Sequence, residues 1–144
     1  IQWREKITMI SAYPACFYKE KSGGYSVVFP DINHLATCGD TLDQALAMAV
    51  DCLAGYLYSA ARDGETVPEP SAIGSIQPDQ EYDEYEEVFV NLVAVDVAEY
   101  AKTHFEKAVK KTLTIPRWLN DRAEREGVNF SQLLQAALRQ KLGV

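Results

Sequence analysis

Short apolar runs separated by turn-forming residues make up the N-terminal part of the chain. Residues 13–18 are rich in aromatic side chains, residues 21–24 (KSGG) supply turn chemistry, and residues 25–29 form a second apolar run. Pro30 ends this run, because a proline cannot donate a hydrogen bond inside a sheet. A shorter run around residues 36–38 precedes a Gly-Asp turn. The pattern predicts a β-hairpin followed by a third strand.

The periodicity then changes to that of an amphipathic helix. Thr41 is suited to the N-cap position, and Gln44 stands at the spacing of a capping box. Apolar residues then recur at steps of three and four, which is typical of one helical face: Leu42, Ala45, Leu46, Ala49, Val50, Leu53, Tyr56, Leu57 and Ala60. We expect this helix to pack on one face of the sheet.

Residues 64–80 contain three prolines and two glycines, which predicts a surface connection. The nearly continuous apolar run 88–95 is rich in β-branched residues and predicts a strand that is buried on both faces. The order of elements is therefore β-β-β-α-β, which we expect to form a small mixed sheet with one helix packed on it. A short linker, residues 97–108, follows, with Tyr100 and Phe105 as its anchors to the body.

A strand is predicted at residues 109–115, near the end of the chain. Alternation places Val109, Leu113 and Ile115 on one face, together with Lys111. The other face carries one ammonium group and two hydroxyl groups, from Lys110, Thr112 and Thr114. One face can therefore be buried, and the other can form hydrogen bonds.

Two helices are predicted after this strand. Pro116 suits the first turn of a helix, and Gly127 suits the left-handed position that follows a helix. Asn129 is a natural N-cap for the second helix, with Gln132 at the capping-box spacing. One strand and two helices are too small to bury a core, and the strand has no mate. Two copies that pair their strands and interlock their helices remove both deficits, so we expect an obligate homodimer.

Charge divides the chain into two parts. Residues 1–100 hold 5 basic and 17 acidic side chains, a net charge of −12, whereas residues 101–144 hold 9 basic and 4 acidic side chains, a net charge of +5. This asymmetry favours a polyanionic partner for the tail and a cationic or neutral partner for the body. The alternative is that the two parts attract each other.

The cysteines and the apolar runs indicate the compartment. Three cysteines without a CxxC pair favour reduced thiols in the cytoplasm, where we expect them to be small buried side chains. The apolar runs are too short for a membrane span. Met9 can be a native start, so we begin the body there.

The acidic residues of the body do not form a catalytic pattern. Metal-assisted cleavage of a phosphodiester needs several carboxylates that converge on one or two cations. Asp31 and Asp40 fall at predicted turns, and Asp43 and Asp51 fall on the polar side of the helix. The two histidines lie in different parts of the chain, and no Cys/His cluster appears. We therefore expect no enzymatic activity, no metal and no cofactor.

Two segments resemble a known family. Residues 110–142, KKTLTIPRWLNDRAEREGVNFSQLLQAALRQKL, resemble a ribbon-helix-helix DNA-binding domain, and residues 25–57, YSVVFPDINHLATCGDTLDQALAMAVDCLAGYL, resemble the body of HicB antitoxins. The resemblance covers roughly residues 12–70 and 88–143. It implies an α+β fold, with a partial ribonuclease-H-like body at 9–96, a linker at 97–108 and a ribbon-helix-helix module at 109–144. Such proteins neutralise HicA, a small mRNA endoribonuclease, and repress their own operon.

The resemblance assigns DNA contacts to the tail. In a dimer, the two-stranded ribbon would enter the major groove with Lys110, Thr112 and Thr114 toward base edges. Phosphates would be bound by the N-terminus of the second helix and by two basic side chains: Asn129, Phe130, Ser131, Lys111 and Arg117. The alternative is that the strand is a solvated edge and serves dimerisation only.

The body would bind the toxin. Its acidic charge would attract an RNA-binding surface, and EYDEYEE (residues 81–87) could imitate RNA, with carboxylates for phosphates and tyrosines for bases. The alternative for this segment is a solvated acidic loop. The candidate contact residues are Tyr25, Phe29, Pro30, Asp31, Tyr82 and Tyr85. Two other functions stay open: a DNA-binding regulator whose body senses a small ligand, and a metal-dependent nuclease. Whether dimers pair into tetramers is also open.

Overall fold

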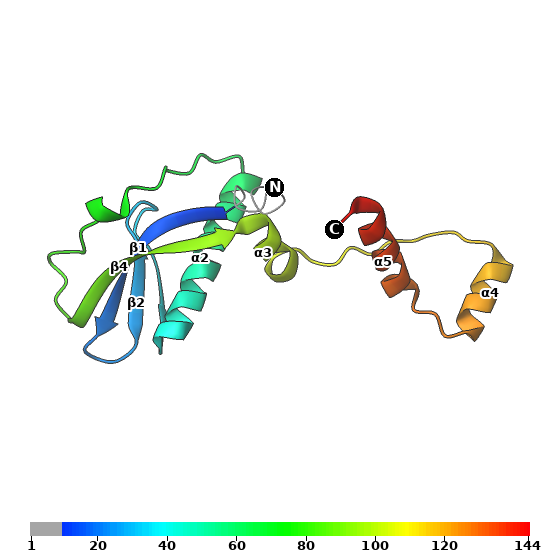
Figure 1. The fold of residues 1–144 in the computed structure, drawn as a ribbon, viewed down its shortest axis with the longest axis horizontal. Helices are drawn as coiled ribbons and strands as arrows, with labels where there is room; N and C mark the ends of the chain where they lie inside the picture. The colour runs from blue at the N-terminus through cyan, green and yellow to red at the C-terminus, as the bar shows by residue number, and fades with distance from the viewer. Residues whose placement is uncertain (1–9) are drawn as a thin grey trace. The chain divides into compact units, whose positions relative to one another are not determined.

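The computed structural model describes residues 10–144, and the question of a start at Met9 falls outside them. The chain divides after Lys107 into two compact units, which we call the body and the tail (Ala108–Val144). Figure 1 shows their elements. Each unit is described by itself.

The body is built on a four-stranded sheet in the order β3-β2-β1-β4. The strands and the helix between them are β1 (Ile10–Glu20), β2 (Tyr25–Phe29), β3 (Leu35–Gly39), α2 (Leu42–Arg62) and β4 (Tyr85–Asp96). The predicted order β-β-β-α-β is confirmed. The expected mixed sheet is wrong, because every pairing is antiparallel: β4 returns beside β1 in the opposite direction, from Ile10 opposite Asp96 to Tyr18 opposite Val88.

The helix α2 begins where the sequence predicts. The Thr41 hydroxyl accepts a hydrogen bond from the backbone N–H of Gln44 at 3.2 Å. The Gln44 side chain in turn accepts one from the backbone N–H of Asp40 at 3.0 Å, one residue before the position of a standard capping box. Two otherwise unpaired backbone groups are therefore satisfied at the start of this helix.

The hydrophobic core lies between α2 and one face of the sheet. Its fully buried members include Phe17, Val27, Phe29 and Leu53, and the rings of Phe17 and Phe89 stack with centroids 5.0 Å apart. Alanines on α2 let the helix approach the sheet closely. The expected role of the helix as the core partner of the sheet is confirmed.

The strand β4 is an edge strand, and the prediction that it is buried on both faces is wrong. Val93 and Val95 are buried, whereas Leu92 is 48% exposed. Alternate side chains of β4 face the core and the opposite side of the sheet, which α2 does not cover. A long apolar run in an antiparallel sheet can therefore have one open face.

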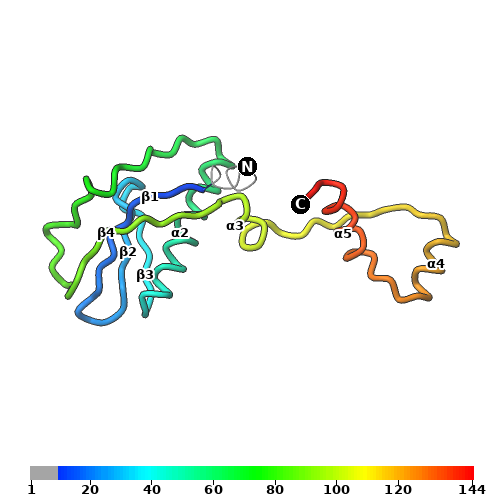
Figure 2. The backbone as a smooth tube through the Cα atoms, viewed as in Figure 1, coloured from blue at the N-terminus to red at the C-terminus, as the bar shows by residue number. Residues whose placement is uncertain are grey.

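A long connection joins α2 to β4, as Figure 2 shows. It contains one 3-10 turn, η1 (Ile73–Ser75), and otherwise neither helix nor strand, which confirms the predicted surface connection. Hydrogen bonds fasten its first half to the rest of the body: the Tyr13 hydroxyl donates to the carbonyl of Pro68 at 2.6 Å, and Asp31 accepts from the backbone and the hydroxyl of Ser71 at 2.8 and 2.6 Å.

The helix α3 (Val97–His104) follows β4 and lies within the body. The Tyr100 hydroxyl donates to Asp51 of α2 at 2.9 Å, and the ring of Phe105 lies 5.4 Å from that of Tyr58. Both predicted anchors, Tyr100 and Phe105, therefore contact the body, as expected.

The tail contains two helices, α4 (Arg117–Arg125) and α5 (Phe130–Leu142), and its residues 108–116 form neither a helix nor a paired strand. The strand predicted at residues 109–115 is therefore absent from the single chain. Gly127 adopts φ 69° just after α4 ends. The backbone N–H groups of Gly127 and Val128 donate hydrogen bonds to the carbonyls of Glu124 and Ala123, which caps the C-terminus of α4. Pro116 precedes the first residue of α4 rather than occupying it. Asn129 caps α5 by accepting from the N–H of Gln132 at 3.1 Å, as predicted.

Candidate interaction surfaces

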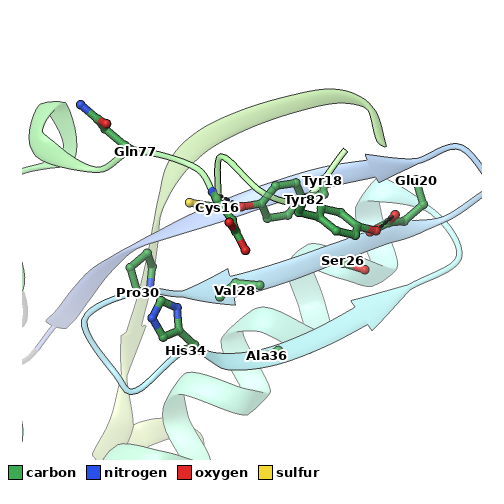
Figure 3. A pocket seen from close by; sticks show the side chains of 11 residues that line it. Cys16, Tyr18, Glu20, Ser26, Val28, Pro30, His34, Ala36, Gln77 and Tyr82 are labelled. Carbon is green, nitrogen blue, oxygen red and sulfur yellow. Dashed lines mark hydrogen bonds between the residues drawn. The ribbon is translucent and has the colours of Figure 1, made fainter. Parts of the chain in front are cut away.

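The face of the sheet opposite α2, which we call the open face, carries side chains in rows across three strands. Cys16, Val28 and Ala36 form one row, and Tyr18 and Ser26 lie side by side in the next. These residues line a pocket of about 710 Å³. Its remaining walls come from the β2–β3 turn, from the end of β1 and from the connection: Pro30, His34, Glu20, Gln77, Asp79 and Tyr82. Figure 3 shows α2 behind the sheet, on the face opposite to the pocket.

The acidic segment is held against this face. The backbone N–H of Asp79 donates to the Tyr18 hydroxyl at 2.9 Å, and the Tyr82 hydroxyl donates to the Glu20 carboxylate. Tyr18 also contacts two aromatic rings of the segment, with centroids 5.3 Å from Tyr82 and 5.4 Å from Tyr85. The acidic segment is thus an ordered wall of the pocket, and its tyrosines stay partly exposed.

Environment shifts the acidity of three groups here. The hydrogen bond to Glu20 raises the pKa of Tyr82 to about 12, because ionisation would place an anion beside a carboxylate. Burial raises the pKa of Tyr18 and of the Cys16 thiol. Cys16 therefore stays protonated at neutral pH and is not a nucleophile.

The cysteines differ in their exposure. Cys16 is buried and Cys52 is half-buried, whereas Cys38 is exposed. The expectation that all three are buried is wrong for Cys38, because it lies on the edge strand β3, on the open face.

The β2–β3 turn contains two consecutive left-handed residues, Asn33 at φ 54° and His34 at φ 56°. This region is uncommon for residues other than glycine, although asparagine and histidine tolerate it better than most. The turn places the His34 imidazole beside Pro30 at the rim of the pocket (Figure 3).

The toxin-contact candidates do not form one surface. Pro30 and Tyr82 both line the pocket, at opposite ends of it (Figure 3), whereas Tyr25 packs against the core on the helix side. Phe29 is 0% exposed, so the prediction that it contacts a partner is wrong: the period of two along β2 directs it into the core. Asp31 fastens the connection through Ser71. The period of two along β2 is visible in the sequence, so it could have shown that Tyr25 and Phe29 point to the same, core-facing side of the sheet.

Residues that the sequence interpretation missed form much of the pocket wall: Cys16, Tyr18, Glu20 and His34. Their alternation on β1 is visible in the sequence. Their meeting with residues 77–82 is not, because it depends on the path of the connection.

Two of the four aspartates that we considered for catalysis have structural partners. Asp31 binds Ser71, and Asp51 accepts from Tyr100. Within residues 10–144, no group of three or more His, Cys, Asp or Glu side chains is arranged to hold a metal ion. In the same range, no helix has the length and apolar character needed to cross a membrane.

The tail exposes both its predicted DNA contacts and its apolar residues. Lys110, Lys111, Thr112 and Thr114 are exposed in the segment before α4, with Arg117 at the start of that helix. Asn129, Phe130 and Ser131 are exposed at the start of α5. Among residues 108–144, all of them described, none is buried, and large apolar side chains are 41–84% exposed: Val109, Leu113, Ile115, Trp118, Leu119, Phe130, Leu133, Leu138, Leu142 and Val144.

Comparison with known proteins identifies the family. The family model described as HicB_like antitoxin of bacterial toxin-antitoxin system matches residues 13–137. The chain is 31% identical over 115 residues to an uncharacterized 14.9 kDa protein in the rep-hol intergenic region of Haemophilus phage HP1. The matched residues cover 78% of each of the two chains. It is also 40% identical over 62 residues to Antitoxin HicB 1 of Photorhabdus laumondii. That match spans 43% of this chain and 40% of that protein, so it covers about two fifths of the curated antitoxin's length.

Solved structures agree with this family. A chain of a toxin-antitoxin complex from Streptococcus pneumoniae is 33% identical, with a TM-score of 0.60 over 92% of this chain and 99% of that one. The antitoxin HicB of Burkholderia pseudomallei shares the fold at 22% identity, with a TM-score of 0.50 over 92% of this chain and 98% of that one.

The family model and the 33% identical chain of the toxin-antitoxin complex define the class of protein, a bacterial antitoxin. The chain belongs to the HicB-like antitoxin family of bacterial toxin-antitoxin systems. Members of this family have no enzymatic activity, in agreement with the interpretation of the body as non-catalytic, and we do not retain the nuclease alternative.

Proposed function

We propose that this chain is an antitoxin that binds and neutralises a HicA-type mRNA endoribonuclease through its body. Its tail forms a ribbon-helix-helix homodimer that binds operator DNA and represses the operon of the pair. The observation that carries the tail's part is the absence of any buried side chain among residues 108–144. A peptide with so many exposed apolar residues is stable only when a second surface covers them.

A second copy of the tail is the natural cover. If residues 109–115 of two chains pair antiparallel, the apolar face with Val109, Leu113 and Ile115 turns toward the helices. The opposite face then presents Lys110, Thr112 and Thr114 in a two-stranded ribbon, the form in which strands enter the major groove. The capped N-terminus of α5 supplies N–H groups for a phosphate.

Charge supports the assignment of the toxin to the body. Residues 1–100 carry a net charge of −12, and a ribonuclease must present a cationic surface to its RNA. A related chain, 33% identical to this one, was solved as part of a toxin-antitoxin complex. We further propose that the antiparallel sheet with α2 is a partial ribonuclease-H-like fold that has lost its catalytic carboxylates and keeps a binding role.

The operator test uses the double variant Thr112→Ala with Thr114→Ala. We expect weaker binding to operator DNA in a gel-shift titration, because two base-edge contacts are lost. Dimerisation and toxin neutralisation should be unchanged, since both hydroxyls are exposed and, in the proposed ribbon, face away from Val109 and Leu113. Operator binding as tight as that of the native protein would reject the ribbon assignment.

The toxin test is co-expression of this chain with the product of the reading frame that neighbours its gene, which we expect to be a small basic protein. The proposal predicts that the two proteins co-purify and that the chain abolishes the partner's cleavage of mRNA. A neighbouring protein that neither co-purifies nor cleaves mRNA would contradict the antitoxin assignment.

The pocket on the open face favours a second candidate function, a DNA-binding regulator whose body senses a small ligand. A volume of about 710 Å³ lies within the range of small-molecule sites. In that case a small molecule from the host should change operator affinity while no protein partner is required.

A further inference from the structure

The pocket on the open face combines aromatic walls with carboxylates and lacks a cation. Tyr18 and Tyr82 lie close together on one side, with Glu20 at the end of β1 beside them, as Figure 3 shows. Asp79 adds a second carboxylate from the connection. Of the described residues that line the pocket, none is a lysine or an arginine. The pocket is therefore chemically suited to a positively charged group.

The hydrogen bonding of Glu20 is incomplete. One carboxylate oxygen accepts from the Tyr82 hydroxyl, whereas the other, Oε1, is buried and has no hydrogen-bond partner. A carboxylate oxygen without a protein donor keeps its capacity to accept hydrogen bonds from N–H groups. Glu20 and Tyr82 both line the pocket, so a ligand there can contact the carboxylate and the ring together.

Geometry and chemistry together select a guanidinium group. A planar guanidinium stacks on aromatic faces, and its N–H groups form paired hydrogen bonds with a carboxylate. The partly exposed ring of Tyr82 supplies the aromatic surface, and Glu20 supplies the acceptor. A lysine ammonium is a compact, strongly hydrated charge. It neither stacks as a flat group on an aromatic ring nor forms paired hydrogen bonds with a carboxylate.

We propose that this pocket receives an arginine side chain of the basic protein partner, which stacks on Tyr82 and pairs with Glu20. The identity of that partner as the toxin rests on the proposed function, whereas the chemistry of the pocket does not. The net charge of −12 in residues 1–100 provides long-range attraction, and the pocket provides the specific anchor. The remaining volume receives the chain on either side of the arginine.

A direct test uses a capped tripeptide, acetyl-glycyl-arginyl-glycinamide, added to the full-length chain and followed by two-dimensional NMR of backbone amides. We expect saturable shifts at Tyr18, Ser26 and His34. The same peptide with lysine should bind more weakly, and the peptide with uncharged citrulline should cause no saturable shift. Equal binding of the citrulline peptide would overturn the proposal, because it would show that charge is not recognised.

Variants separate the pocket from general acidity. Glu20→Gln keeps an acceptor for Tyr82 and removes the charge, so we expect at least about a tenfold loss of arginine-peptide affinity. The matched control is Asp83→Asn, which removes the same charge from an exposed position of the acidic segment that does not line the pocket. It should change the affinity by less than about twofold. Equal losses in both variants would reject a specific anchor.

Tyr82 supplies a second pair of variants. Tyr82→Phe keeps the ring and releases the Glu20 oxygen that the hydroxyl occupies, so the arginine peptide should bind at least as tightly as to the native chain. Tyr82→Ala removes the stacking face and should weaken binding several-fold. Loss of binding in Tyr82→Phe would contradict stacking on this ring.

Toxin binding distinguishes the two proposals. If the toxin co-purifies with Glu20→Gln as tightly as with the native chain, the arginine anchor is wrong and the antitoxin function stands. If the arginine peptide binds but no protein partner co-purifies with the native chain, the antitoxin function is wrong and the pocket stands.

Discussion

Leu133→Ala tests the dimerisation of the tail most directly. Leu133 lies on the apolar face of α5 and is 60% exposed in the single chain. Its truncation therefore removes little packing from one chain alone. In the proposed dimer the same side chain is buried against the second copy.

The expected magnitude follows from this exposure. Leucine to alanine removes three carbons at about 0.8 kcal/mol each when fully buried. Scaled by the 60% that dimerisation would cover, the loss is about 1.4 kcal/mol per chain. A dimer contains two copies of Leu133, so the total loss of dimerisation free energy is about 2.9 kcal/mol. This corresponds to a dissociation constant that is roughly 100-fold higher.

The assay is analytical ultracentrifugation over a concentration series that spans the dissociation constant of the native protein. The control is Gln132→Ala on the same helix, an exposed polar position on the side opposite the apolar face, where alanine keeps the backbone N–H that Asn129 caps. We expect the control to dimerise like the native protein. Operator affinity should fall with dimerisation in Leu133→Ala, because half a ribbon presents half the contacts.

Two results would refute the reasoning. The first is a native protein that sediments as a monomer at concentrations where it binds DNA. The second is a Leu133→Ala dimer as tight as the native one, which would mean that this face of α5 is not buried in the assembly.

Two predictions concern the body. Gly39→Ala should destabilise it by about 2 kcal/mol or more, measured by urea unfolding, because the new Cβ would lie 2.4 Å from the backbone nitrogen of Ala45. Gly74→Ala, which meets no atom within 4 Å, should change stability by less than about 0.5 kcal/mol, and a similar loss in both would contradict the close-packing argument. In a tyrosinate absorbance titration, Tyr82 should ionise near pH 12, and Glu20→Gln should move its pKa back toward 10. Because the folded-state pKa is the higher one, the contribution of Tyr82 to stability is present below pH 10 and is lost as the pH rises from about 10 to 12. An unchanged titration in Glu20→Gln would show that the hydrogen bond to Glu20 is not the cause.

Local signals in the sequence predicted the strands and the long helix of the body well, as well as the caps of two helices. The second strand was expected at residues 25–29 and occupies Tyr25–Phe29, and the predicted caps at Thr41 and Asn129 both form their hydrogen bonds. These features depend on a few neighbouring residues, whose propensities and side-chain hydrogen bonds act at short range. The same holds for Gly127, which adopts the left-handed conformation expected at the end of a helix.

The pocket could not be predicted in the same way. Glu20 and Tyr82 are 62 residues apart in the chain, and Tyr18 and Asp79 are 61 residues apart. Their meeting depends on the path of the connection and on the antiparallel return of β4, which a pattern of apolar residues does not specify. An apolar run indicates a strand, but its partner and its direction are decided by the whole chain.

The sequence by itself therefore determined the order of strands and long helix in the body, the division of charge and the exposed apolar character of the tail, because each depends on residue type and spacing along the chain. Only the tertiary structure decided which face of the sheet is open and which distant side chains border it. Contacts between distant residues form when the chain closes long loops around a shared core. The free energy of loop closure depends on all the contacts of the folded chain, so a local pattern of residues does not reveal it.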